Sequence, residues 1–157
     1  MKEIKIKFLI VGVMMIVSTV SFSQKPFDVQ SVGINVSYKM VFGFVSIPEN
    51  LPLWTQAFSK ADNKSAVMVT PNGEMPIKME TVVSEKLGTV DWIMTMPDGS
   101  IGRAFSRITK NGEGVIYSFV LMAPPVPMEQ LEGTLATQKK LLADELIGLK
   151  NLLESKE

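Results

Sequence analysis

The C-terminal segment, residues 126–157, constrains the fold most, because it carries one long apolar stripe. Its apolar residues recur at intervals of three, four or seven positions, the period of an α-helix, and they are Met128, Leu131, Leu135, Leu142, Leu146, Leu149 and Leu153. A single helix cannot bury its own stripe, so another layer has to cover it. We therefore expect this helix to lie on a sheet formed by the middle of the chain.

A polar residue interrupts the stripe at Gln138, which fills the one seven-residue gap between leucines. Small side chains precede it at Gly133, Thr134 and Thr137. A buried glutamine needs hydrogen-bond partners, which could be a strand carbonyl or a trapped water. The same amide could instead hold an oxygen atom of a ligand. The sequence leaves both alternatives open.

The N-terminus has the three parts of a secretory signal peptide, residues 1–23. Lysines precede an uncharged run, residues 8–20, and small residues precede a cleavage site near Ser23-Gln24. The alternative is an uncleaved anchor, but the purely apolar part is shorter than the roughly 20 residues that a membrane span needs. No cysteine follows the apolar run, so a bacterial lipid anchor is not expected there. We expect a periplasmic or secreted protein whose mature form, residues 24–157, is one domain without a membrane span.

The absence of two residue types excludes several kinds of catalytic and metal site. The chain contains no His and no Cys, which excludes Ser-His-Asp and Cys-His catalysis and zinc sites built on those residues. We expect no cofactor and no metal, and a binding protein rather than an enzyme. Removing the signal segment takes away three Lys and one Glu, which leaves a net charge of −2 and no basic cluster. Nucleic acid is therefore not an expected partner.

The first part of the mature chain predicts a strand and a helix. Residues 25–37 alternate, with Val32, Ile34 and Val36 on one face and small or polar residues on the other. Ser37 is placed to cap a short helix over residues 38–46, because its hydroxyl can accept a hydrogen bond from the first helical turn.

A second short helix is expected over residues 49–58, with Pro48 in its first turn. Pro52 lies inside this segment, and it limits the helix to its opening turn or bends it. Trp54 is expected to seal this helix against the sheet. The polar residues 59–65 are expected to form a loop.

Residues 65–123 read as a meander of antiparallel strands, because three turn sequences with Asn-Gly or Asp-Gly separate alternating segments. The expected strands are residues 66–70, 75–83, 88–96, 100–109 and 115–122. Residues 124–127 then form a stiff, proline-rich crossover to the final helix.

The turns also predict strand register. A two-residue loop at Asn111-Gly112 pairs Ile108 with Val115, Ser106 with Tyr117, Ala104 with Phe119 and Gly102 with Leu121. A three-residue loop at residues 97–99, with Gly99 in the left-handed region, pairs Trp92 with Ala104 and Met94 with Gly102. The two registers place small residues opposite large ones and agree with each other. A two-residue turn at Asp98-Gly99 would instead pair Trp92 with Phe105 and mix the two faces.

The preferred register collects one set of residues on each face of the sheet. The expected inner face holds Val90, Trp92, Met94, Met96, Gly102, Ala104, Ser106, Ile108, Val115, Tyr117, Phe119 and Leu121. The expected outer face holds Thr89, Asp91, Ile93, Arg103, Phe105, Arg107, Ile116 and Ser118. Asp91 and the two arginines then form a solvated charge cluster, whereas the alternative turn would make the arginines an anion clamp on Trp92's face. Lys78 and Glu80 should also face water.

Residues 41–54 have the sequence VFGFVSIPENLPLW. This pattern resembles the first-helix signature of the START and birch-pollen-allergen superfamily, also called SRPBCC. Residues 88–92, 97–99 and 145–153 are similar to the polyketide cyclase/dehydrase-like branch. The resemblance covers about residues 28–155. One departure is the export signal, since most members are cytoplasmic.

The resemblance implies an α+β helix-grip fold, in which a curved antiparallel sheet with two short helices wraps around a long C-terminal helix. It also implies a cavity for a hydrophobic small molecule, such as a lipid, isoprenoid or polyketide-like compound. Fold does not settle function, so two alternatives remain. One is a cyclase/dehydrase-type enzyme in which Tyr117 and Gln138 polarise carbonyl groups. The other is a protein-interaction module with a filled core.

The candidate ligand-binding residues are Trp92, Met94, Tyr117, Phe119, Thr134, Gln138 and Trp54. Each could equally be part of a packed core. The small residues Gly102, Ala104 and Ser106 on the sheet favour open space beneath the helix. We expect the helix from Leu141 onward to pack as core, and its first half, residues 131–138, to roof that space.

Overall fold

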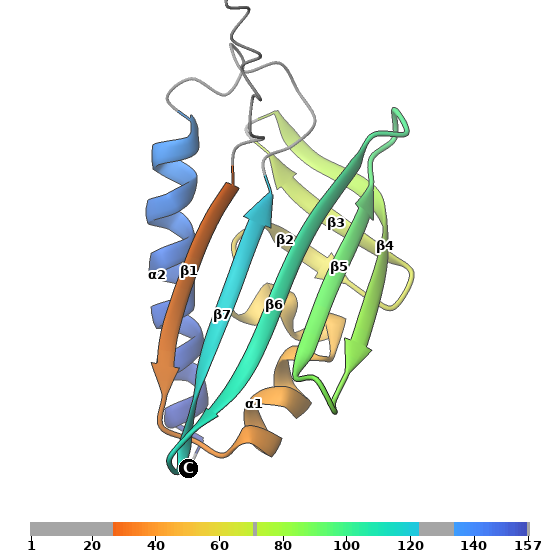
Figure 1. The fold of residues 1–157 in the computed structure, drawn as a ribbon. Coiled ribbons are helices and arrows are strands. Elements are labelled where there is room, and N and C mark those ends of the chain that lie inside the picture. Colours follow the sequence, from red (N-terminus) through yellow and green to blue (C-terminus); the bar gives the residue numbers. More distant parts are fainter. Residues whose placement is uncertain (1–26, 71, 123–133, 157) are drawn as a thin grey trace, which may run out of the picture.

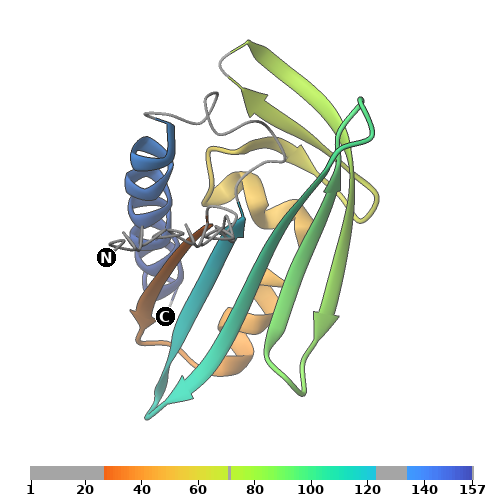
Figure 2. The ribbon, with the colours of Figure 1, turned by 45° about the horizontal axis from the view of Figure 1, so that its top comes forward.

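The computed structural model describes residues 27–70, 72–122 and 134–156, and it shows one seven-stranded antiparallel sheet. The strand order is β1-β7-β6-β5-β4-β3-β2, and the sheet curls along its length (Figure 1, Figure 2). Its strands are β1 (Phe27–Ile34), β2 (Phe58–Ala61), β3 (Ser65–Thr70), β4 (Gly73–Ser84), β5 (Thr89–Thr95), β6 (Ile101–Asn111) and β7 (Gly114–Met122).

Three helices lie on one side of the sheet. Helix α1 (Tyr38–Val45) and the 3₁₀ helix η1 (Pro48–Leu53) connect β1 to β2, and the long helix α2 (Thr134–Glu154) lies beside β1 (Figure 1). Figure 2 shows the curled sheet enclosing the side on which all three helices lie. The predicted α+β helix-grip architecture is thus confirmed. Within the described ranges, neither α2 nor any other helix is long and apolar enough to cross a membrane.

Helix α1 begins directly after Ser37, the residue that was predicted to cap it. Ser37 has an extended backbone, and its hydroxyl accepts a hydrogen bond from the Met40 amide. Val41, Phe42 and Val45 are the buried residues of this short helix. The cap satisfies a backbone donor that the first helical turn leaves without a partner.

The second helix is shorter than predicted, and part of the expected loop is a strand. Only residues 48–53 are helical, and they form a 3₁₀ helix, because Pro52 supplies no amide donor inside the segment. Residues 58–61 form β2, which pairs with β3 through Phe58↔Met68 and Ala61↔Ala66. The prediction of a polar loop from residue 59 was wrong because β2 is a short edge strand, whose exposed polar residues Ser59 and Lys60 are typical of sheet edges.

The hairpin between β5 and β6 has the predicted register. Trp92 pairs with Ala104 and Met94 with Gly102. The loop has three residues, and Gly99 within it has a φ of 84°, where other residues are strained.

The register between β6 and β7 is shifted by two residues from the prediction. Ala104 pairs with Leu121 and Ser106 with Phe119, and the last pair is Asn111↔Gly114. The two loop residues are therefore Gly112 and Glu113, of which only Gly112 has a positive φ, 60°. A loop at Asn111-Gly112 would require a positive φ at both residues, whereas a type II′ turn places the glycine first.

A shift of two residues leaves every side chain on its predicted face, because side chains alternate with a period of two. Val90, Trp92, Tyr117 and the other inner-face residues are buried or packed against the core. Arg103 and Arg107 are exposed on the outer face, as are Lys78 and Glu80. The alternative in which the arginines form an anion clamp beside Trp92 is therefore wrong.

The leucine half of α2 packs as predicted. Leu142, Leu146, Leu149 and Leu153 are buried in one cluster with Ile34 and Val36 and with the apolar side chains of α1. Residues 131–133 and the side chains of residues 134–135 lie outside the described part of the structure, as does the predicted signal peptide.

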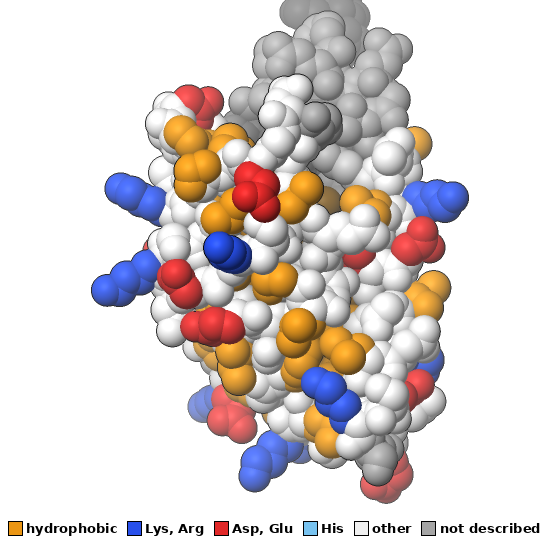
Figure 3. Space-filling model, turned by 180° about the vertical axis from the view of Figure 1, so that it is seen from behind, with side chains coloured by type: hydrophobic (Ala, Val, Ile, Leu, Met, Phe, Trp, Pro, Cys, Tyr) orange, Lys and Arg blue, Asp and Glu red, His pale blue; other side chains and the backbone are white. Residues whose placement is uncertain are grey.

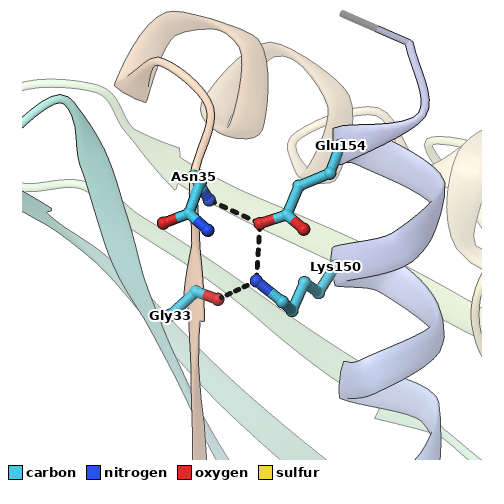
Figure 4. A network of polar contacts seen from close by, with 4 residues as sticks. All are labelled: Gly33, Asn35, Lys150 and Glu154. Carbon is cyan, nitrogen blue, oxygen red and sulfur yellow. Dashed lines mark hydrogen bonds and ion pairs between the residues drawn. The ribbon is translucent and has the colours of Figure 1, made fainter.

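A polar network fastens the end of α2 to the end of β1 (Figure 4). The Asn35 amide donates a hydrogen bond to Glu154 Oε1 at 2.7 Å, and Lys150 donates to the Gly33 carbonyl oxygen at 3.1 Å. Lys150 and Glu154 form an ion pair one helical turn apart. The hydrogen bond from Lys150, followed by that from Asn35, lowers the pKa of Glu154. This network ties the last turns of α2 to the end of β1.

Glu145 fastens the middle of the same helix to the segment after η1. Its Oε1 accepts hydrogen bonds from the Thr55 hydroxyl at 3.0 Å and from the Gln56 amide at 2.6 Å. Thr55 is buried, and burial of the Glu145 carboxyl raises its pKa despite these two hydrogen bonds. The two bonds tie the loop before β2 to α2.

We predict that Glu145→Gln keeps both hydrogen bonds, because the amide oxygen still accepts them, and removes a partly desolvated charge. The folded state holds the Glu145 proton more tightly than the unfolded chain does. The wild type therefore loses stability relative to Glu145→Gln as the pH rises above 4.5, the ordinary pKa. Urea unfolding from pH 4 to pH 8 measures this difference. Glu145→Leu, which removes the acceptor, should cost about 1–3 kcal/mol. An equal loss for the two variants at pH 7 would contradict this account.

Gly88 occupies a position that only glycine fits. Its φ is 69°, and a Cβ there would collide with the backbone carbonyl oxygen of Ile108. The Ile108 amide donates to the Gly88 carbonyl oxygen at 2.8 Å, so β6 lies directly against this turn.

We predict that Gly88→Ala lowers the free energy of unfolding by at least about 2 kcal/mol, because strain in the left-handed region adds to a backbone collision. Gly43→Ala is the control. Gly43 lies in α1 with open space around it, so alanine there should be neutral or stabilising by up to about 1 kcal/mol. Thermal or chemical unfolding of both variants checks the contrast, and an equal response would refute it.

Candidate functional site

An aromatic cluster occupies the inner face of the sheet. Trp92 of β5 lies 5.7 Å from Phe119 of β7, measured between ring centroids. Trp54, just after η1, meets Tyr117 at 6.4 Å and Phe119 at 6.2 Å, both edge to face. Such geometry is favourable for aromatic pairs. Four of the predicted site residues are thus brought together from three distant parts of the chain.

Methionines line the neighbouring strands of the same face. Met68 pairs across strands with Met75, and Met79 with Met94. Met79 and Met94 are buried, and Met68, Met75 and Met96 pack against the core. The methionine side chain is flexible and polarizable, so it adapts to neighbours of different shape. The inner face therefore has an aromatic half and an adaptable methionine half.

The expected open space above Gly102 is filled by these methionines. A Cβ on Gly102 would lie 3.3 Å from the Met96 methyl group and 3.5 Å from the Met94 methyl group. The inference of an open space from this small residue was therefore wrong. The atoms that fill the space are the ends of flexible side chains, which can move.

Three buried polar atoms on the inner face have no hydrogen-bond partner within the part of the chain that the structure describes. They are the indole Nε1 of Trp92, the hydroxyl of Tyr117 and the hydroxyl of Thr81. Trp92 is 2% exposed, Tyr117 is 0% exposed, and Thr81 pairs with Trp92 across β4 and β5. A buried donor left without a partner costs about 1–3 kcal/mol. Buried polar groups are normally hydrogen-bonded, so this concentration marks the face as a candidate ligand site.

Burial raises the pKa of Tyr117, and the nearby Ser106 hydroxyl counters part of the rise. The Ser106 hydroxyl itself donates to the Val90 carbonyl oxygen at 2.6 Å. No hydrogen bond of acceptable geometry joins Ser106 to Tyr117 in the described chain. The phenol therefore stays protonated and remains a hydrogen-bond donor.

The other predicted site residues are Met94, Gln138 and Thr134. Met94 is buried beside the aromatic half, as its strand register requires. Gln138 lies half-buried on α2, and the Thr134 side chain lies outside the described part. Their roles as ligand contacts stay predictions.

Sequence reasoning missed Thr81 and the methionines of β3 and β4 as site residues. The signal for them was present, since Met75, Ile77, Met79 and Thr81 alternate along one strand. That strand precedes a turn without an Asn-Gly or Asp-Gly pair. Its pairing with Trp92 could therefore not be read from turn length.

No protein-family model and no curated protein matches this chain. Solved structures do match. A START superfamily protein from Mycobacterium smegmatis aligns with a TM-score of 0.62 and 13% identity over 81% of this chain and 98% of that one. The Aha1 dimer from Colwellia psychrerythraea aligns with a TM-score of 0.58 and 18% identity over 82% of this chain and 96% of that one.

A third match is DynU16, from the dynemicin biosynthetic locus, with a TM-score of 0.60 and 15% identity over 85% of this chain and 49% of that one. Identities this low establish the fold alone. The curled sheet, the two short connecting helices and the long C-terminal helix are those of the START-like, or SRPBCC-like, helix-grip fold.

Proposed function

We propose that this protein binds a hydrophobic small molecule, such as a lipid, an isoprenoid or a polyketide-like compound, against the inner face of its sheet. The observation that carries the proposal is the set of unpartnered buried donors, Trp92 Nε1 and the Tyr117 hydroxyl, on a face lined by aromatic and methionine side chains. The START-like fold supports it, because proteins of this fold generally bind hydrophobic ligands. The signal-like N-terminus supports binding outside the cytoplasm.

A ligand can enter only if the methionine side chains of the inner face change their conformation. Met94 and Met96 lie over Gly102 with their flexible ends, so rotation of these side chains frees space beside Trp92 and Phe119. Apolar ligand surface would then replace methionine contacts, at about 25 cal/mol for each Å² removed from water. A donor that gives its hydrogen bond to an oxygen atom of the ligand would lose the cost of its burial.

The cyclase/dehydrase alternative would need Tyr117 to transfer its proton. Burial raises the pKa of this phenol, which makes it a poor acid and a stable hydrogen-bond donor. The buried hydroxyl side chains of Thr55 and Ser106 are not general acids or bases at neutral pH, and the carboxylate of the half-buried Glu145 is held by the Thr55 hydroxyl and the Gln56 amide. Binding therefore fits the site better than catalysis does.

We predict that Tyr117→Phe does not destabilise the ligand-free protein and raises its free energy of unfolding by up to about 2 kcal/mol. The substitution keeps the ring and removes a buried hydroxyl that has no partner. Urea unfolding of delipidated protein measures it. A loss of 1 kcal/mol or more would mean that the hydroxyl has a structural partner, and would contradict its role as a donor kept for a ligand.

The proposed function is tested by native mass spectrometry of the protein purified from its own host. We expect an additional non-covalent mass of lipid size that is lost on denaturation. Nile red, a neutral dye, should bind the delipidated protein and be displaced by the extracted compound. A bare protein mass together with no dye binding would support the filled-core alternative instead.

Two adjacent substitutions locate the binding face. Gly102→Leu places a bulky side chain against Met94 and Met96 and takes the space into which they would move, and Arg103→Leu places the same side chain on the outer face. We expect at least a tenfold loss of Nile red affinity for the first and no change for the second, with thermal unfolding confirming that both fold. Equal affinities would refute the inner face as the binding site.

A further inference from the structure

The chemistry of the inner face distinguishes neutral from charged ligands. Trp92 Nε1 is only a donor, so the one group that satisfies it is a hydrogen-bond acceptor. Tyr117 lies on the same face, two residues along β7 from Phe119, which packs on Trp92. Both donors are more than nine-tenths buried and without a partner in the described chain. An occupant of this face therefore needs an acceptor oxygen in its apolar part.

No cation accompanies those donors. The buried side chains in the described ranges include no Lys and no Arg. The described Lys and Arg residues are exposed, except the half-buried Lys150, which is already paired with Glu154. In Figure 3 the Lys and Arg side chains on the viewed side project outward, away from the body of the molecule. The stretch from residue 111 to residue 138 contains no Lys or Arg in its sequence either.

Glu145 brings a negative charge toward the aromatic cluster. Glu145 of α2 is half-buried, and its carboxyl group points to Thr55 and Gln56, beside Trp54 of the aromatic cluster. Burial has already raised the pKa of this carboxyl, so the surroundings disfavour negative charge. A second carboxylate placed on the inner face would lose its hydration without gaining a counter-ion, at a cost of several kcal/mol.

Resting on the proposed function, we propose that the ligand is neutral: an apolar molecule whose ketone, ester, aldehyde or hydroxyl oxygen accepts from Trp92 Nε1, with the Tyr117 hydroxyl as a second donor on the same face. A free carboxylate, as in a fatty acid at neutral pH, is excluded. A carboxylic acid binds only after it takes up a proton. Its affinity therefore falls about tenfold for each pH unit above a ligand pKa of about 5.

Matched ligands test this inference, because replacing a methyl group by a carboxylate oxygen changes charge with little change in shape. Decan-2-one is compared with nonanoate, and 2-acetylnaphthalene with 2-naphthoate. Affinity at pH 7.5 is measured by displacement of Nile red. We expect each ketone to bind at least tenfold more tightly than its carboxylate, and the carboxylates to gain about tenfold per unit as the pH falls to 5.5.

The indole signals report the same contact directly. The chain has two tryptophans, so a ¹H–¹⁵N spectrum carries two indole Nε1–H signals, and Trp54→Phe assigns the one from Trp92. Decan-2-one should move the Trp92 signal downfield, and decane, which has no acceptor, should not. Tyr117→Phe should weaken ketone binding about two- to tenfold and leave decane binding unchanged.

The outcomes separate the two proposals. Equal or tighter binding of the carboxylates at pH 7.5 overturns the neutral ligand and leaves the binding function standing. A Trp92 signal that does not respond to a bound ketone overturns the assignment of the donor. Failure of all four ligands overturns this inference, and native mass spectrometry then shows whether a hydrophobic molecule of another kind is bound.

Discussion

The packing of α2 on the β1 side of the curled sheet is the constraint on which the rest of the structure depends. Four leucines on one stripe, Leu142 to Leu153, are buried there with Ile34 and Val36. Lys150 and Glu154 fasten the end of the helix to β1 (Figure 4). Glu145 fastens its middle to the loop before β2. The leucine contacts stabilise the packing of α2, and the polar contacts tie the helix to β1 and to the loop before β2. Together they hold the helix at one side, so that the other strands of the inner face are lined by aromatic and methionine side chains.

The buried polar groups of the structure differ in whether they have hydrogen-bond partners. The buried leucines of α2 pack on aliphatic side chains, and the polar groups at the end and middle of this helix have partners. The inner face of the sheet carries Trp92 Nε1 and the hydroxyls of Tyr117 and Thr81, which have no partner in the described ranges. A sequence selected only for stability would replace them, because a buried donor without an acceptor costs about 1–3 kcal/mol. Their presence on one face is the physical reason for interpreting this face as a binding surface, and the absence of a buried cation beside them sets the charge of the ligand.

Much of the architecture could be predicted, because side-chain alternation and turn chemistry act locally. The face on which each residue from Val90 to Leu121 lies was predicted from the turns. These faces were correct despite the two-residue error in the β6–β7 register, because a shift by an even number of residues leaves each side chain on the same face. The short η1 and the edge strand β2 could not be predicted, since Pro52 and polar side chains fit several local structures. The site was half predicted. The aromatic residues could be recognised in the sequence as large apolar side chains on the inner face. Thr81 could be added only from its pairing with Trp92, and the position of the methionines over Gly102 only from the three-dimensional packing.

The central claim is that the inner face beside Trp92 and Phe119 receives an apolar molecule. An isotope-filtered NOESY spectrum of the labelled protein with unlabelled decan-2-one tests it most directly, because it reports which protons of the chain lie within about 5 Å of the ligand. The account predicts cross-peaks from the ligand to the rings of Trp92, Tyr117 and Phe119 and to the methyl groups of Met94 and Met96. Cross-peaks confined to outer-face residues such as Ile93, Phe105 and Ile116 would contradict it.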